Sequence, residues 1–312
     1  MNMKKIFFLV IILFSLPYSS WGGPLSPDDV FSYGPSAEQE VDVYLPKKKI
    51  EINGFIIHFH GGYGIEGDKG NKIYREIAEV FNKNGVIFMS ANYRLFPRAS
   101  YEEQVNDVAV AIKAALDFID TRFFFSVVGK PIVVSSHSFG ANIVAKAILD
   151  SKNNVLDRKV IERISRVVLL DGPMNMSEVA QNVDSKTWSE NFGPVFGDQL
   201  NAEYLYHISP VKSAEEMKAQ AEKKPEKSQR EQEGDSIPKF LVAYRDKDRA
   251  IQQSLQFASA LATVTEVSII SPPGYTHQEF NDRLADEGSI IFKAVMSSFR
   301  LIEPPLPGEE GG

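Results

Sequence analysis

The sequence contains no cysteine, so neither disulfide bonds nor thiolate metal sites can contribute to the structure. Acidic residues outnumber basic ones by 41 to 34, and no basic cluster interleaved with aromatic residues is present. That composition disfavours nucleic acid and anionic membrane surfaces as partners. With 312 residues and 43% hydrophobic content, the chain can bury the core of one large enzyme domain, whose stability must come from packing.

Long hydrophobic runs are absent too, because no apolar stretch reaches the roughly 18 residues that a membrane-spanning helix needs. Residues 1–22 begin with Lys4-Lys5, continue through the apolar stretch Ile6 to Phe14, and end with Ser20-Trp21-Gly22. This order is typical of a secretory signal peptide with a small-residue cleavage site. We therefore expect export to the periplasm or outside the cell, with residues 23–312 as the mature protein and no stable membrane span. An uncleaved N-terminal anchor is the alternative.

A candidate nucleophile follows the apolar run at 133–135, where Ser138 enters a tight turn that opens a helix. A serine hydroxyl attacks well only when geometry exposes it, a base removes its proton and fixed dipoles accept the oxyanion. The string Ser136-x-Ser138-x-Gly140 departs by one residue from the Gly-x-Ser-x-Gly elbow, and serine is small enough for the departure to be mild. An ordinary turn capped by a serine is the alternative.

The partners of such a serine are expected in the order Ser, Asp, His, and the chain has them in that order. Asp248 is the predicted acid, because it follows the apolar run at 240–244 and precedes a new helix; Asp246 is its rival. His277 ends a last strand and a Pro/Gly loop, where a general base is expected. His277 would take the proton of Ser138, and the aspartate would fix its tautomer.

The chain has only four other histidines, and none fits the role of the base as well. His58 alternates within a strand, His60 begins a glycine pair, His137 is buried in the elbow, and His207 has no supporting context. A predicted strand at 55–59 runs directly into the loop that begins with His60, Gly61 and Gly62. The free amides of Gly62 and Tyr63, with that of Phe139 after the serine, are the predicted oxyanion hole.

Apolar segments of strand length alternate with helical stripes along the chain, which predicts an α/β fold with a mainly parallel sheet covered on both faces. The predicted strands lie near 41–45, 55–59, 86–90, 131–135, 166–171, 239–244 and 266–270. Helical stripes run from Ile73 to Phe81, before a C-cap at Asn84-Gly85, and from Val105 to Ile119. Asp107 in the second stripe is assigned a structural contact and no catalytic role.

An insertion is expected at about 174–236, because more than a simple crossover separates the strand ending at Asp171 from the next one. Its first half is rich in aromatic residues and could pack as a cap that lines an acyl pocket. Residues 212–235 are rich in Glu, Lys and Gln, which indicates an exposed helix or a mobile linker. The tail at 304–312, rich in Pro, Glu and Gly, is predicted to be disordered.

Several strings together resemble the α/β-hydrolase superfamily, in its esterase branch with a His-Gly-Gly motif. Besides the elbow and His60-Gly61-Gly62, they are Asp42-Val43-Tyr44-Leu45-Pro46, Gly67-Asp68-Lys69 and Ala91-Asn92-Tyr93-Arg94-Leu95-Phe96-Pro97. The match covers roughly residues 38–302 and is similar to feruloyl-esterase-like and kynurenine-formamidase-like carboxylesterases. The resemblance implies acyl-enzyme chemistry with no cofactor and no metal.

The sequence therefore predicts a serine esterase that acts on a small-molecule ester, with small aryl or acetyl esters as the expected substrates. Amide or formamide hydrolysis by the same machinery is the nearest alternative, since only the protonation of the leaving group differs. A noncatalytic relative that binds a partner through the charged insertion is an alternative of another class. The acyl and alcohol specificity and the oligomeric state are not predicted, because loops build those surfaces.

Overall fold

The computed structural model describes residues 26–47, 49–124, 128–150, 155–197, 201–223 and 237–299. The predicted signal peptide, the predicted disordered tail and residues 224–236 of the predicted insertion lie outside the described residues. In the described ranges, no helix is both long enough and apolar enough to cross a lipid bilayer.

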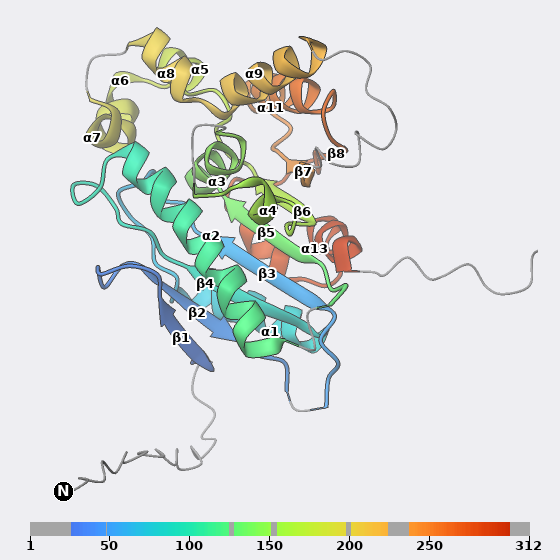
Figure 1. Ribbon diagram of the computed structural model, residues 1–312. Helices are drawn as coiled ribbons and strands as arrows, with labels where there is room; N and C mark the ends of the chain where they lie inside the picture. Colours follow the sequence, from blue (N-terminus) through green and yellow to red (C-terminus); the bar gives the residue numbers. More distant parts are fainter. Residues whose placement is uncertain are drawn as a thin grey trace, which may run out of the picture.

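The fold is built on an eight-stranded sheet, which confirms the predicted α/β-hydrolase architecture (Figure 1). In the sheet the strands follow the order β1-β2-β4-β3-β5-β6-β7-β8. The strands are β1 (Asp29–Ser32), β2 (Glu40–Tyr44), β3 (Gly54–Phe59), β4 (Val86–Ala91), β5 (Ile132–His137), β6 (Arg166–Leu170), β7 (Lys239–Ala243) and β8 (Val267–Ile270). Pairing is parallel from β4 to β8 and antiparallel at β1 and β2. All seven predicted strands are present, and β1 is an additional edge strand.

The central strands β3, β4 and β5 are buried along their whole length and are mainly apolar, because both faces of the sheet are covered. Every residue of β3 is buried, and its side chains alternate between two apolar clusters: Phe55 and Ile57 belong to one, Ile56 to the other. This period of two is the geometry of an extended strand. The sheet therefore separates two cores and holds its strand ends in fixed positions.

Helices cover each face in the way the helical stripes predict. The helices α1 (Lys72–Lys83) and α13 (Ile290–Met296) supply one core, and α2 (Tyr101–Phe123), α3 (Phe139–Leu149) and α11 (Asp248–Leu261) supply the other. The predicted end of α1 is confirmed, since Asn84 is its C-cap and Gly85 has a φ of 77°. Short helical turns complete the chain: α4 (Arg158–Ile161), α12 (Glu279–Asp282), η2 (Arg283–Ala285) and η3 (Ser297–Phe299).

In the described parts of the segment between β6 and β7, short helices alternate with turns, and Figure 1 shows these helices gathered beyond one end of the sheet. They are α5 (Met176–Asn182), α6 (Ser185–Thr187), η1 (Trp188–Phe192), α7 (Gly193–Phe196), α8 (Ala202–Ile208) and α9 (Pro210–Lys223). Aromatic contacts pack these helices against the core. The ring centroids of Phe192 and Phe196 lie 6.5 and 6.0 Å, respectively, from the ring centroid of Phe139. The charged second half begins as α9, whose Ser213 and Ala214 are buried, so this helix has one packed face.

Candidate active site

Ser138 sits at the sharp turn between β5 and α3, where the sequence predicts a nucleophile. Its backbone has a φ of 57° and a ψ of −131°, a conformation that residues with a side chain rarely adopt. Two hydrogen bonds hold it there: the Ser138 amide donates to the Leu170 carbonyl at 2.9 Å, and the Ala141 amide donates to the Ser138 carbonyl at 2.9 Å. The turn therefore places the Ser138 side chain just beyond the end of β5, where it lines a cavity.

Small residues around Ser138 allow this close packing. A Cβ on Gly140 would lie 2.2 Å from the His60 carbonyl oxygen, and one on Gly172 would lie 2.8 Å from the Ser138 carbonyl oxygen. Ser136, which replaces the first glycine of the elbow, is fully buried, and its hydroxyl donates to the Val168 carbonyl at 3.4 Å. A serine is thus accommodated at that position, as expected.

Three side chains from distant parts of the sequence form one hydrogen-bonded chain. Nε2 of His277 lies 2.8 Å from the Ser138 hydroxyl, and Nδ1 of the same ring lies 2.5 Å from Oδ2 of Asp171. A carboxylate is an acceptor only, so Asp171 places the imidazole proton on Nδ1 and leaves Nε2 free to accept the serine proton. The predicted pairing of Ser138 with His277 is present in this geometry.

The predicted acid is wrong in its position, because the carboxylate on Nδ1 of His277 belongs to Asp171, not to Asp248 or Asp246. Asp248 is the first residue of α11, and Asp246 is exposed in the turn after β7. The reason is the strand order: β6 is the direct neighbour of β5, with Leu170 opposite His137, whereas β7 lies one strand farther away. The residue that follows Leu170 therefore emerges beside Ser138 at the same edge of the sheet.

A signal for Asp171 was present in the sequence. It directly follows a buried strand and precedes Gly172, which lets the backbone approach Ser138 closely. The order Ser, Asp, His is satisfied by Asp171 as well as by Asp248, so order alone does not separate them. The choice depends on which strands are neighbours, and that is a property of the tertiary structure.

The surroundings of Asp171 favour the ionised carboxylate. The side chain is buried, which by itself would raise its pKa, but the hydrogen bond with His277 and the positive charge of Arg245 outweigh burial, and the pKa is lowered. The Arg245 amide donates to Oδ1 at 3.1 Å, and Nε of Arg245 lies 2.6 Å from Oδ2. Asp171 is thus a negative charge held next to the imidazole.

The loop after β3 lies against Ser138. A Cβ on Gly61 would lie 2.7 Å from Cβ of Ser138, while Gly62 and Tyr63 take positive φ values of 109° and 56°. In the part of the chain that the structure describes, the amides of Gly62, Tyr63 and Phe139 donate to no other protein group. Backbone donors left free beside a hydroxyl form the kind of arrangement that can bind an oxyanion.

The other histidines have structural surroundings, as the sequence indicates. Nε2 of His137 lies 2.9 Å from the carbonyl oxygen of His277, and burial followed by repulsion from His277 lowers the pKa of His137 to about 4. Nδ1 of His58 lies 2.8 Å from the Ser135 hydroxyl, and burial lowers its pKa to about 3. His60 stacks on Tyr93 at a centroid distance of 4.6 Å, and His207 lies on α8.

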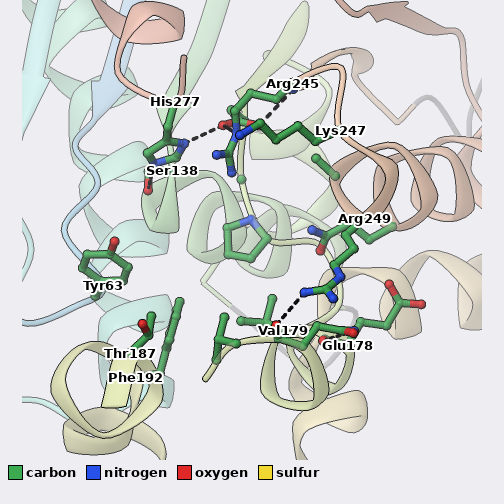
Figure 2. A pocket seen from close by; sticks show the side chains of 17 residues that line it. Tyr63, Ser138, Glu178, Val179, Thr187, Phe192, Arg245, Lys247, Arg249 and His277 are labelled. Atoms are coloured by element: carbon green, nitrogen blue, oxygen red, sulfur yellow. Dashed lines mark hydrogen bonds and ion pairs between the residues drawn. The ribbon is translucent and has the colours of Figure 1, made fainter. Parts of the chain in front are cut away.

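Ser138, His277 and Tyr63 line two cavities that meet at the hydroxyl. The larger, of about 640 Å³, is walled by residues of α5, α6, η1 and the start of α11 (Figure 2). The smaller, of about 470 Å³, is lined by the glycine loop after β3 and by polar side chains that include Asn71, Gln278 and Asn281. Space on both sides of one hydroxyl suits a substrate with two halves.

A family model described as the alpha/beta hydrolase fold matches residues 56–281. The chain belongs to the α/β-hydrolase family. No curated protein sequence matches it significantly.

Solved structures of similar fold cover most of this α/β hydrolase. A truncated carbohydrate esterase from gut microbiota aligns with a TM-score of 0.64 and 18% identity, over 88% of this chain and 98% of that one. Esterase B from Lactobacillus rhamnosis aligns with a TM-score of 0.60 and 15% identity, over 89% of this chain and 87% of that one. A thermophilic esterase from the planctomycete Thermogutta terrifontis aligns with a TM-score of 0.58 and 16% identity, over 86% of this chain and 90% of that one. At these identities the likeness concerns the fold.

The remaining strings that resemble the family hold the loops of this α/β hydrolase in place. Lys69 pairs with the buried Asp42, and its amide donates to Oδ1 of Asn92 at 2.5 Å. Arg94 donates two hydrogen bonds of 2.8 Å to Asp107, which confirms the structural role expected for that aspartate. Across the described ranges, no group of three or more His, Asp or Glu side chains is arranged to hold a metal ion.

Proposed function

We propose that this α/β hydrolase is a serine esterase that cleaves carboxylic esters through an acyl-enzyme intermediate. The observation that carries the proposal is the hydrogen-bonded chain of Ser138, His277 and Asp171, with distances of 2.8 and 2.5 Å, next to free backbone amides. The solved structures of similar fold include proteins described as esterases, which supports the same activity here.

In the first half of the proposed reaction, Ser138 Oγ attacks the ester carbonyl carbon while Nε2 of His277 takes its proton. The negative charge that develops on the carbonyl oxygen is stabilised by the amides of Gly62, Tyr63 and Phe139. The ester bond then breaks, and the imidazolium returns the proton to the departing alcohol oxygen. Asp171 keeps the imidazole in the productive tautomer and stabilises its charged form.

In the second half, a water molecule replaces the alcohol, and His277 removes its proton as the water attacks the acyl carbon. The bond between the acyl group and Ser138 Oγ breaks, the proton returns to the serine, and a carboxylic acid leaves. The two cavities beside the hydroxyl would hold the acyl and alcohol halves, and Tyr63, whose ring meets that of Phe192 edge-on at 5.1 Å, forms a wall of both.

Covalent labelling combined with turnover tests this proposal. A fluorophosphonate probe is expected to modify the folded wild type and to spare Ser138→Ala and heat-denatured protein. Hydrolysis of 4-nitrophenyl acetate and butyrate should be lost in Ser138→Ala and kept in Ser189→Ala, which removes an exposed hydroxyl in η1. Equal labelling of wild type and Ser138→Ala would refute the role of Ser138. Activity on an N-formyl arylamine with none on either ester would favour formamide hydrolysis instead.

Export is a separate proposal that depends on residues 1–22, which lie outside the described residues. It rests on the order of a basic start, an apolar stretch and a small-residue end. N-terminal sequencing of protein recovered from the producing cells tests it, and an intact Met1 on protein retained in the cytoplasm would contradict it.

A further inference from the structure

The turn between β7 and α11 carries charges of alternating sign in the sequence Arg245-Asp246-Lys247-Asp248-Arg249. Its three basic residues all line the larger cavity next to Ser138, as Figure 2 shows from the labelled side chains. The molecule as a whole is acidic, with a formal net charge of −7. Three cations at one cavity therefore do not reflect the average surface of the protein.

Two of these cations are available to a ligand. Arg245 is occupied by Asp171, but among the side chains that the structure describes, which do not include that of Asp248, no carboxylate lies within ion-pair distance of Lys247 or Arg249. Arg249 is held in place nonetheless, because its Nη1 donates to the Asn182 carbonyl of α5 at 2.5 Å. Its guanidinium thereby bridges the start of α11 and the insertion at the cavity wall.

The carboxylates that face the same cavity do not cancel this charge. The described lining residues include Asp171, which is engaged by Arg245 and His277, and Glu178 on α5. Lys247 and Arg249 together thus oppose the single charge of Glu178. The first turn of α11, a helix of 14 residues that begins at this wall, adds the partial positive charge of its free amides.

We propose that the larger cavity selects esters that carry a carboxylate on the half of the molecule that occupies it, with Lys247 and Arg249 as the residues that bind this carboxylate. The inference rests on the proposed esterase function and adds the substrate class. A guanidinium and an ammonium on one wall recognise a carboxylate by charge-assisted hydrogen bonds. The expected substrates are therefore half-esters of dicarboxylic acids or esters of alcohols that bear an acidic group.

Matched pairs of esters test the proposal on each half of the substrate. For the acyl half the pair is 4-nitrophenyl hexanoate and mono-4-nitrophenyl adipate, which differ by a terminal carboxylate; a longer pair, octanoate and suberate, allows for the depth of the cavity. For the alcohol half the pair is phenyl butyrate and 4-(butyryloxy)benzoate. In each pair the measured quantity is the ratio of kcat/KM for the anionic ester to kcat/KM for the neutral one.

The expected result is that this ratio falls about five- to tenfold in the double variant Lys247→Gln/Arg249→Gln for at least one pair. Comparing one ratio between two proteins cancels the intrinsic reactivity of the esters. Arg249→Lys, which keeps the charge, should retain most of the preference. Lys72→Gln, which removes a cation exposed on α1, should leave the ratio as in wild type. Added NaCl should lower the ratio in wild type, because salt screens such contacts.

An unchanged ratio in every pair, with the neutral esters still hydrolysed, would overturn this inference and leave the esterase function standing. If wild type hydrolysed neither the neutral nor the anionic esters, the proposed function itself would fail, and the inference with it.

Discussion

At the scale of single residues, chemistry in this protein depends on what each polar group contacts. Asp171 is buried and yet ionised, because an imidazole on one side and a guanidinium on the other replace the water it lost. His137 and His58 are buried without such partners and are held neutral. His277, which lies between Ser138 and Asp171, is the histidine with a hydrogen-bond partner suited to each ring nitrogen.

The identity of the acid can be tested with two isosteric substitutions. Asp171→Asn keeps an acceptor for the Arg245 amide but no longer fixes the His277 tautomer, so kcat on 4-nitrophenyl butyrate should fall about 10³- to 10⁴-fold. Asp248→Asn should keep kcat close to that of wild type. Thermal unfolding of each purified variant checks that the fold is kept. A large loss in Asp248→Asn with little change in Asp171→Asn would restore the acid expected from the sequence.

At the scale of elements, the site depends on how closely α3 and the loop after β3 approach each other. Gly140 in the first turn of α3 touches the carbonyl of His60, and Gly61 touches Ser138. A hydrogen bond from α2 also fixes the loop after β3, because the buried Gln104 side chain donates to the Gly64 carbonyl at 2.8 Å. The free amides and the hydroxyl thus share one rigid frame that is built from three elements.

Adding one methyl group at this contact should damage both activity and stability. In Gly140→Ala the new Cβ would lie 2.2 Å from the His60 carbonyl oxygen, which is backbone and can move only with its loop. We expect a loss of about 1–3 kcal/mol in the free energy of unfolding. We also expect a lower kcat on 4-nitrophenyl butyrate, because the loop amides are displaced from Ser138. Urea titrations and steady-state kinetics measure the two effects.

Gly288→Ala is the matched control, because its Cβ would meet only the side chain of Asp286, at 3.2 Å in an exposed turn. This control should behave like wild type. Wild-type stability and kcat in Gly140→Ala would show that the contact between α3 and the loop is not tight.

At the scale of the whole molecule, the sheet buries titratable groups that couple folding to pH. The folded-state pKa of His137 is about 4, below the ordinary value of 6.5, so between these values the unfolded chain binds a proton that the folded chain does not. The free energy of unfolding therefore falls as the pH drops from 6.5 towards 4. For His137 alone the loss over this window is about 3 kcal/mol. His58 acts in the same direction.

This coupling predicts a difference in slope between two variants. From pH 7 to pH 4.5, the urea midpoint of His137→Gln should decline less steeply than that of wild type, because one buried titrating group is gone. His207→Gln removes an exposed histidine on α8 and should keep the wild-type slope. Identical slopes in wild type and His137→Gln would mean that burial of His137 does not contribute to the acid sensitivity.

By itself the sequence determined the class of the fold, the positions of seven of the eight strands, and the pairing of Ser138 with His277. Short stretches of sequence determine those features, through runs of apolar residues with a period of two or 3.6 and through short turns rich in glycine. The strand β1 was missed because it is four residues long and alternates between half-buried and exposed residues at the edge of the sheet.

Only the tertiary structure decided which aspartate contacts His277 and which residues line the larger cavity. Asp171 and Asp248 both lie near the ends of buried strands in the right order, and they differ in whether the strand before them adjoins β5, which no local pattern records. Likewise, Arg249 meets α5 across 67 positions of sequence. Strand neighbours and cavity walls are set by packing over the whole chain, and for this reason local patterns predict the elements better than the side chains that meet between them.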